Sequence, residues 1–492
     1  MISDQLPIIQ IVILLVASPL CVIFRNGNWA WAIATLSTWT VLGIVSFLTF
    51  NIIQEGPISY HLGGWRPPFG IEYSLDSLNI YIILLIVFIA SIILPYSKGI
   101  IKKEIEHNRR HLFYSIFLLA LLGLIGIAAT GDLFNVYVFL EISSLATYVL
   151  IGLGRKRQSL KAAYRYLIQG TIGATFILIG IGFLYSMTGT LNMSDLSTRL
   201  QPIIDTRPVI AGISIITVGI LIKLALFPLH LWLPAAYTHA PTVVSAFLAA
   251  VSTKVGAYLL LRFIYSIIGP SLTFDSIPLL EILLSLASLA ILVGAIIAIF
   301  QNDIRRLLAF SSISQIGYLV VGISIPTVTG LTGGIVHIAN HGITKGAMFM
   351  TIGCIAYSVG ETKLKNLKGL AKRMPFTSAA LLIGGLSLIG VPGTAGFIGK
   401  WYIVQAALDY GLWPVAIIVL LGSLLAIIYV GKILESIYFS KGEIVFGRVE
   451  KLSFYQIIPV WLLIIATIYF GIHTDLTLGI SIEASNTLVG GQ

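Results

Sequence analysis

Five ionisable side chains lie inside long apolar stretches of this 492-residue sequence. Placing a charge in the hydrocarbon of a bilayer costs about 2.5–3.5 kcal/mol even on the mildest scale, so each such residue in a membrane span is a candidate functional group. One of the five is a carboxylate and four are amines, which suits the transfer of protons. They are Glu141, Lys223, Lys254, Lys345 and Lys400.

Each lysine taken singly also has a structural explanation, because its long side chain can extend to the lipid headgroups or form one ion pair. That explanation fits four lysines and one carboxylate less well. In addition, Lys223 and Lys400 lie beside helix-breaking residues, at corresponding positions of an internal repeat. The set therefore favours a proton relay.

Two histidines extend this set. His337, His341 and Lys345 follow one another at intervals of four residues, which places them on one face of a helix. Histidine titrates nearest neutral pH and relays protons readily, although two structural hydrogen-bonding groups would show the same spacing. We interpret the pair as members of the relay.

Four further residues are possible members of the relay or of a gate. His230 and His239 lie in the amphipathic segment 227–241. Zinc binding by these two is disfavoured, because the segment lacks the additional ligands that such a site needs. Lys432 and Glu435 lie in a later apolar stretch, where they fit either a relay or an interface ion pair.

The chemistry that these residues suggest is proton transfer between lysine, histidine and water. Loss of water favours a neutral lysine and a nearby carboxylate favours a protonated one, so movement of Glu141 relative to Lys223 would load or unload a proton. A sodium site would need a cluster of oxygen ligands. With one carboxylate at mid-membrane, the sequence favours protons over sodium as the ion that passes through this chain.

The cysteine content argues against redox chemistry in this chain. Cys21 and Cys354 lie in apolar runs and form no CxxC motif, so no metal, iron–sulfur or other cofactor site is expected. No catalytic residue is expected either, and at most the chain is a proton-pumping subunit of an oxidoreductase complex.

The elements that position these residues are membrane helices. The sequence is 57% hydrophobic and only 10% charged, with a mean hydropathy of +0.97, which excludes a soluble protein. Apolar windows of about 18 or more residues predict an all-α membrane protein of about fourteen spans. They lie near 6–24, 29–52, 77–96, 112–130, 133–153, 162–187, 208–228, 242–268, 278–300, 306–324, 329–358, 376–408, 412–438 and 454–472.

Two spans contain helix breakers. Pro228 and Pro234 interrupt the seventh, and residues 390–396, with three glycines and a proline, split the twelfth. Breaks at membrane depth occur where the freed backbone is buried in protein or lines a wet cavity, so they point to a transport site.

The distribution of basic residues predicts the topology. Loops after odd-numbered spans carry roughly twenty Lys and Arg, including Lys441 and Arg448, against about three in the other loops. This bias explains the net charge of +10 without nucleic acid and predicts both termini on the outside of the cytoplasmic membrane. The tail after His473 is polar and too short for another span.

An internal repeat has a constant offset of 171–172 residues. Residues 131–133 match 302–304, residues 169–176 match 341–348, and residues 185–186 match 357–358. Units of five helices must then lie in opposite orientations, an inverted repeat typical of ion transporters. The expected parts are helices 1–3 (1–110), a first repeat (111–270), a second repeat (271–440), and a last helix with a short tail (441–492).

Four motifs carry a resemblance that covers nearly the whole chain. They are GDLF at 131–134 with Glu141, the run 223–246 around FPLHLWLPAAY, the run 302–318 (NDIRRLLAFSSISQIGY), and GFIGKW at 396–401. With these motifs the sequence resembles the antiporter-like subunits of respiratory complex I, membrane-bound hydrogenases and Mrp-type cation/proton antiporters.

The resemblance implies fourteen helices, two inverted five-helix repeats and broken helices seven and twelve. It also implies a proton path through the residues that match Glu141, Lys223, Lys254 and Lys400, with the histidines of span eleven between the halves. Partners would be the other subunits of a hetero-oligomeric membrane complex.

Segments 61–72 and 76–78, the short tail and Lys400 resemble the Mrp D subunit and its hydrogenase relatives more than the other family members. We therefore expect a proton-translocating subunit of a multisubunit Na+/H+ antiporter. The alternative is the proton-pumping subunit of an NADH:quinone oxidoreductase or membrane-bound hydrogenase. A stand-alone solute transporter is disfavoured, because lysines rather than hydrogen-bonding neutral groups lie at the breaks.

Overall fold

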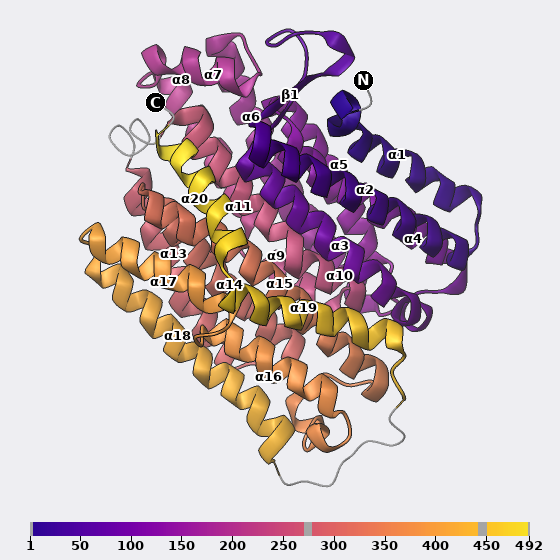
Figure 1. Cartoon of the computed structure of the whole chain (residues 1–492). Helices are drawn as coiled ribbons and strands as arrows, with labels where there is room; N and C mark the ends of the chain where they lie inside the picture. Colours follow the sequence, from indigo (N-terminus) through magenta and orange to yellow (C-terminus); the bar gives the residue numbers. More distant parts are fainter. Residues whose placement is uncertain (1–2, 270–277, 441–449, 491–492) are drawn as a thin grey trace.

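The structure, a computed structural model, describes residues 3–269, 278–440 and 450–490. The described residues form a bundle that is nearly all helical (Figure 1). Three long helices come first, preceded by a 3-10 turn, η1 (Ser3–Gln5). They are α1 (Leu6–Ile23), α2 (Gly27–Glu55) and α3 (Ser77–Glu104).

The first repeat follows a 3-10 turn, η3 (His107–Arg109), and has five membrane elements. Its fourth is broken, and its fifth alternates between α-helix and the wider π-helix. Outside them lie α7 (Met193–Leu200) and η4 (Gln201–Ile203). The five elements are α4 (Arg110–Ala129); α5 (Leu133–Gly152); α6 (Arg157–Thr188); α8 (Arg207–Leu224) with α9 (Trp232–His239); and α10 (Thr242–Phe247), η5 (Leu248–Ser252), α11 (Thr253–Leu261) and η6 (Arg262–Ile268).

The second repeat has the same plan, and two more helices end the chain. Two 3-10 turns, η7 (Leu364–Asn366) and η8 (Leu370–Lys372), precede its broken element. The elements are α13 (Leu279–Ile299); α14 (Ile304–Ser324); α15 (Val328–Val359); α16 (Pro375–Ile389) with α17 (Ala395–Asp409); and α18 (Trp413–Leu434) continued by the π-helix η9 (Glu435–Phe439). The last two helices are α19 (Phe454–Ile472) and α20 (Asp475–Gly490).

The predicted spans correspond to these helices. In the described part of the chain, 13 helices are long and apolar enough to cross a membrane. The remaining expected span, 376–408, is the pair α16 and α17, two helices of 15 residues each. The all-α, multi-pass architecture is therefore confirmed.

The inverted repeat is visible in the backbone. An isolated bridge pairs Asp132 with Asn192, and an equivalent bridge 171 residues later pairs Asp303 with Lys363. Asp132 and Asp303 also cap their helices in the same way, each accepting a hydrogen bond from the amide three residues on, at 2.7 and 3.2 Å. The offset found in the sequence thus relates two equal local structures.

These two local structures lie at opposite ends of the bundle. Asp303 and Lys363 line a cavity of about 640 Å³ with Lys103 and Arg155, at what we call the basic end. The segment beside Asp132 lines a different cavity, of about 430 Å³, with residues before α3 and at the end of the first repeat. The two repeats are therefore inverted.

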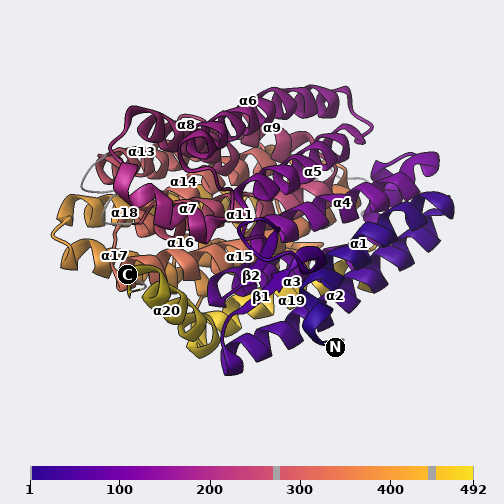
Figure 2. The ribbon, with the colours of Figure 1, turned by 90° about the horizontal axis from the view of Figure 1, so that it is seen from above.

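Helix α15 connects the two repeats. It packs against α10 and η5 of the first repeat and against α14, α16 and α17 of the second, as well as α3, α19 and α20. Figure 2 shows it near the middle of the bundle, with α1 and α2 at one edge and α17 and α18 at the other. Residues on α15 consequently lie at the junction of the halves.

The structure departs from the sequence predictions in two places. Segment 58–75, expected to be a loop, contains an antiparallel pair, β1 (Ile58–His61) and β2 (Glu72–Leu75), joined through the short 3-10 turn η2 (Leu62–Gly64). The tail after His473, expected to be polar and too short for another span, forms the 16-residue helix α20, which is not among the 13 candidate spans. Its buried serines pack on α15 and α3, with Ser485 accepting from Thr332 at 3.1 Å.

Some predictions concern positions outside the described residues. Lys441 and Arg448, which contribute to the predicted charge bias, both belong there. The predicted boundaries at 270/271 and 440/441 also coincide with the gaps between the described ranges. The division of the chain into four parts stays a prediction.

Candidate functional site

Lys223 lies in the last turn of α8, where the break exposes backbone groups. The helix ends because Ala225 has a left-handed φ of +60° and proline follows at 228. The indole of Trp232 donates to the freed carbonyl of Ile222 at 2.9 Å, so the broken backbone is satisfied inside the protein. Lys223 is half-buried, and its Nζ donates to Ser144 Oγ on α5 at 2.6 Å.

Glu141 lies on the same helix as this serine. It precedes Ser144 by three residues, less than one turn, so both occupy one face of α5. Its side chain is half-buried, and it takes part in none of the ion pairs found among the described residues. The structure therefore brings Glu141 near Lys223. The group that Lys223 contacts directly is the hydroxyl of Ser144.

A small cavity connects Lys223 with the next helix. It measures about 30 Å³ and is lined by Lys223, Ser144, Ser252 and Gly256. This volume accommodates a water molecule, and six of its lining residues carry polar side chains: Ser143, Ser144, Thr147, Tyr166, Lys223 and Ser252. Ser252 is the last residue of η5, two positions before Lys254.

Lys254 is almost fully buried, at 1% exposure. It follows the π-helix η5 directly, and π-turns inside α-helices are frequent at functional sites. Its Nζ donates to the carbonyl of Ala249 in that turn and lies 3.5 Å from Thr253 Oγ1. The ammonium is thus held by neutral oxygens.

The two predicted histidines stack on each other on α15. Their rings are nearly parallel, 6° apart in plane and 5.8 Å between centroids. His337 Nε2 shares a hydrogen bond with Gln315 Oε1 at 3.0 Å. Both ring nitrogens of His341 lack a hydrogen-bond partner among the described residues, although the side chain is only 2% exposed. An orphaned buried imidazole demands a functional explanation, since buried polar atoms are otherwise paired.

Lys345 shares the helix face of the histidines but turns to α14. Its Nζ donates to the carbonyl of Leu308 at 2.9 Å and to Ser311 Oγ at 2.5 Å. It is fully buried, at 0% exposure. Lys345 is therefore buried with the two histidines, and its hydrogen bonds are to α14.

The side chain of Lys400, on α17, extends back to the break between α16 and α17. Helix α16 ends at Ile389, before Gly390 with a φ of +91°, and Lys400 Nζ donates to the freed carbonyls of Leu388 and Ile389 at 2.8 and 3.0 Å. It also donates to Ser423 Oγ at 3.2 Å. The amine thus closes the carboxyl end of a half-helix, where a positive charge is favoured.

A hydrogen-bonded path joins Lys400 to the histidines. The carbonyl of Leu388, which Lys400 contacts, also accepts from Gln315 Nε2 at 3.3 Å. The other end of the same amide contacts His337. Three bonds thus lead from the amine of Lys400 through Gln315 to the stacked pair of histidines.

The predicted equivalence of Lys223 and Lys400 is wrong in detail. Lys223 precedes its break and Lys400 follows its own, and they are 177 residues apart instead of 171. The helix before one break and the helix after the other each supply a buried or half-buried lysine to the carboxyl end of a half-helix. The breaks are equivalent, but the lysines are not.

The other predicted candidates lie outside the group of buried lysines and histidines. His230 is buried with its ring stacked on Phe227, 5.4 Å between centroids. His239 lines the cavity at the basic end. Lys432 Nζ caps the end of α13, donating to the carbonyls of Ile299 and Gln301 at 2.9 Å, and Glu435 is exposed.

The position of Lys432 gives a first prediction. Replacing it with glutamine removes these contacts to the end of α13, and we expect the free energy of unfolding to fall by about 1–2 kcal/mol. Proton flux per folded molecule should stay within about twofold of wild type, since relay residues contribute far larger factors. Thermal unfolding in detergent measures the first and flux in vesicles the second.

The exposed Lys365 provides the control, since Lys365→Gln should change neither quantity. Lost flux with unchanged unfolding for Lys432→Gln would instead place Lys432 in the relay.

Several residues of the site were not predicted from the sequence. Ser144, Ser311, Gln315 and Ser423 accept from the buried lysines or connect them, and Asn340 Nδ2 donates to the carbonyl of Ala395 at 2.7 Å, bracing the second break. In the sequence, these residues differ from their neighbours only in being polar within apolar spans, and none of them carries a charge that would single it out. In the described part of the chain, no three His, Cys, Asp or Glu side chains gather closely enough to hold a metal ion.

Two inverted five-element repeats, a broken element in each, and a buried row of lysines and histidines define a membrane subunit of the ion-translocating class. The family model described as "NADH:quinone oxidoreductase/Mrp antiporter, TM" matches residues 130–426. The chain belongs to this family.

Curated relatives include two kinds of subunit. NADH-quinone oxidoreductase subunit N of Desulforudis audaxviator is 40% identical over 414 residues, which are 84% of this chain and 81% of that protein. A Staphylococcus aureus protein named as antiporter subunit mnhD2 is 33% identical over 495 residues, 100% of this chain and 97% of that protein.

Solved structures show the same fold. A chain of the membrane-bound sulfane sulfur reductase, an archaeal respiratory membrane complex, superposes with a TM-score of 0.91 at 30% identity, covering 99% of this chain and 98% of that one. A chain of the Mrp complex from Dietzia sp. DQ12-45-1b also gives 0.91, at 23% identity, covering 100% and 98%.

Proposed function

We propose that this chain is the proton-translocating membrane subunit of a multisubunit Na+/H+ antiporter. The observation that carries the proposal is the buried row from Glu141 and Lys223 through Lys254 to the stacked histidines, with the hydrogen-bonded connection to Lys400. Protons pass between amines, imidazoles and water, and the Leu388 carbonyl and Gln315 hold Lys400 in position relative to His337. A protonated lysine offers no ligand for a metal cation.

The relay has two sections that meet on α15. On one side, Lys223 and Lys254 lie around the water-sized cavity between α5, α8 and the last helix of the first repeat. On the other, the Leu388 carbonyl and Gln315 hold Lys400 near His337. His341 has both nitrogens available and lies between these sections, so it is the group that accepts a proton from one and passes it to the other. Lys345 sets the charge beside it.

The proposal includes partner subunits. The family relatives in the solved structures are chains of multisubunit membrane complexes. Glu141 is half-buried and faces the periphery of the first repeat. Its helix, α5, exposes three large apolar side chains there: Phe134, Leu145 and Val149. We propose that another subunit covers this part of α5, and that both termini lie outside the cytoplasmic membrane.

A second candidate is the proton-pumping subunit of a redox-linked complex. It is favoured by the 40% identity to subunit N, against 33% to the antiporter subunit. The antiporter relative is matched over the whole chain, whereas the subunit N match covers 84%. The redox reaction would then take place in other subunits.

The test uses the complex purified through this chain and reconstituted into vesicles containing a pH-sensitive dye. We expect a sodium gradient to drive proton movement, and Lys400→Ala to reduce it by at least about tenfold, because its path to His337 is lost. Lys368→Ala, at an exposed lysine, should behave as wild type. Equal flux for Lys400→Ala and wild type would refute the relay.

The energy source of proton movement distinguishes the antiporter function from the redox-linked one. Proton movement that starts only on addition of an electron donor, and that a sodium gradient does not produce, would replace the antiporter assignment with the redox-linked one. The subunits that copurify give the same answer independently.

A further inference from the structure

A basic cavity at the surface lies away from the relay. It measures about 220 Å³ and lies between the start of α2, the end of α3 and the start of α4. Four side chains that are or can become cationic line it: Lys98, Lys102, His107 and Arg110. No carboxylate lines it, and none of the four forms an ion pair among the described residues.

The neighbouring acidic residues are engaged elsewhere. Glu104 accepts from the amide of Thr242 at 2.6 Å, and Glu106 pairs with Arg109 at 3.3 Å. Among the residues that the structure describes, none therefore neutralises the positive charges of the cavity. An uncompensated group of cations around a concave site attracts an anion.

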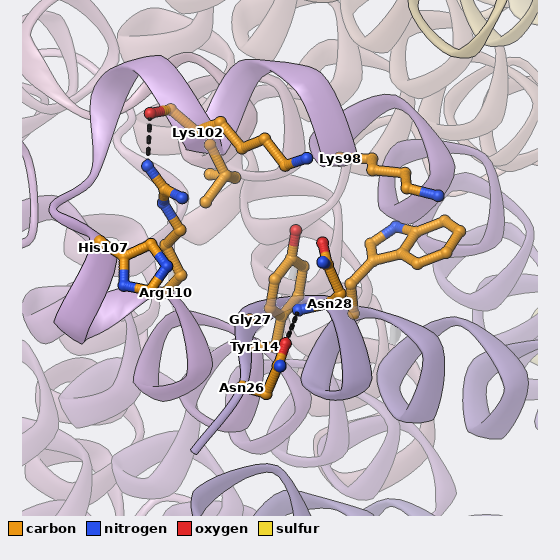
Figure 3. Close-up of a pocket in the computed structure, with 10 residues that line it drawn as sticks. Asn26, Gly27, Asn28, Lys98, Lys102, His107, Arg110 and Tyr114 are labelled. Atoms are coloured by element: carbon orange, nitrogen blue, oxygen red, sulfur yellow. Dashed lines mark hydrogen bonds between the residues drawn. The ribbon is translucent and has the colours of Figure 1, made fainter. Parts of the chain in front are cut away.

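The cationic side chains of the cavity come from three consecutive elements, α3, η3 and α4. Figure 3 shows Lys98 and Lys102 on α3, one turn apart, with Arg110 and His107 to one side and Asn28 below. Arg110 is fixed by donating to the carbonyl of Lys102 at 2.7 Å, so its guanidinium is positioned before any ligand binds. The amino end of the 29-residue α2 closes the site, where a negative charge is favoured.

A close approach of the backbone helps to form this site. A Cβ atom at Gly27 would lie 3.0 Å from Arg110 Cβ, so a larger residue would push the start of α2 away from α4. The small residue thus lets the end of α2 lie beside the arginine.

The surroundings are those of a membrane surface. Lys98 Nζ lies 4.0 Å from the ring centroid of Trp31 and 4.8 Å from that of Tyr455, and aromatic rings of this kind concentrate where headgroups meet hydrocarbon. Next to the cavity, Ile23, Phe24 and Trp29 are 69%, 54% and 63% exposed, a surface that suits acyl chains. A free phosphate would use the cations but not this apolar surface.

We propose that the cavity lined by Lys98, Lys102, His107 and Arg110 binds the phosphate of an anionic phospholipid whose acyl chains lie along α1 and α2. Basic pockets between membrane helices take anionic headgroups in this way. The site is independent of the proton relay and of which complex contains the chain.

The test counts lipids bound to the purified full chain by native mass spectrometry, with phosphatidylglycerol and phosphatidylcholine as probes. We expect one phosphatidylglycerol to bind in preference to phosphatidylcholine. Lys98→Gln with Lys102→Gln should weaken it by roughly 10- to 30-fold, as expected for two cations near a membrane surface. Replacement of both residues by arginine should retain binding.

The matched control removes the same charge from the same end of the protein. Lys365→Gln with Lys368→Gln, both exposed, should leave the bound lipid unchanged. Equal losses in the two double variants would overturn the proposal, because a general surface charge would then explain binding.

A second measurement distinguishes the source of the phosphate. Phosphatidylglycerol should raise the thermal unfolding temperature of the wild-type chain, and inorganic phosphate at millimolar concentration should not. An equal rise with inorganic phosphate would overturn the lipid assignment in favour of a soluble anion. An equal rise with phosphatidylcholine would overturn the role of the cations.

Discussion

Lys223→Ala is expected to reduce proton flux by at least about a hundredfold while the chain still assembles in the membrane, because proton-transfer groups contribute factors of this size. The variant removes the amine that contacts Ser144 on α5 and that borders the cavity shared with Ser252. Dye-monitored flux in vesicles, normalised to the amount of assembled complex, measures the effect.

Lys223→Arg is the sharper variant, because arginine keeps the positive charge but does not release its proton. We expect it to be as inactive as the alanine variant. Retained flux with arginine would show that position 223 works as a fixed charge. Lys161→Ala, at an exposed lysine on α6, should leave flux unchanged and so controls for the loss of a positive charge.

Gly399→Ala is expected to have the second large effect, although it changes no ionisable group. A Cβ atom at this position would lie 2.7 Å from the Cβ and 3.0 Å from the Nδ1 of His337. Helix α17 must then move away from α15, which lengthens the path from Lys400 through Gln315 to His337. We expect flux to fall by about tenfold or more, and the free energy of unfolding to fall by about 1–3 kcal/mol from overpacking.

The matched control is Gly431→Ala. Gly431 also lies inside a helix, α18, but no heavy atom lies within 4 Å of an added Cβ. This variant should transport normally and be slightly more stable, by about 0.4–1 kcal/mol, because alanine restricts the unfolded chain. Normal flux per folded molecule in Gly399→Ala would mean that the contact of α17 with His337 is not part of the route.

The helices of this protein could be predicted because the bilayer imposes a length. A run of about 20 apolar residues satisfies its backbone groups in hydrocarbon most simply as a helix, and the limits of α14 were predicted to within two residues. Helix α3 begins where predicted but continues past residue 96 to Glu104, through a last turn that contains Lys102 and Lys103. The 171-residue offset was equally visible, because the turns at Asp132 and Asp303 require the same residues at both ends of the protein.

The contacts of the buried lysines could not be predicted in the same way. Ser144, Gln315 and the carbonyl of Leu388 carry no charge and have no spacing that distinguishes them from other polar groups in apolar helices. Their roles depend on which helices meet, and only the family resemblance, not the residue pattern of α15, placed this helix between the halves. Helix α20 was missed for a related reason, since its buried serines form a packing face only where they meet α15, including Thr332, and α3.

The number of hydrogen bonds that Lys400 can donate depends on whether its amine is protonated. A protonated amine has three donors, and Lys400 uses them on the carbonyls of Leu388 and Ile389 and on Ser423. A neutral amine has two, so each departing proton releases one oxygen and loosens the tie between α17 and the end of α16 or α18. The charge of Lys400 is therefore coupled, through these three hydrogen bonds, to the packing of α17 against α16 and α18.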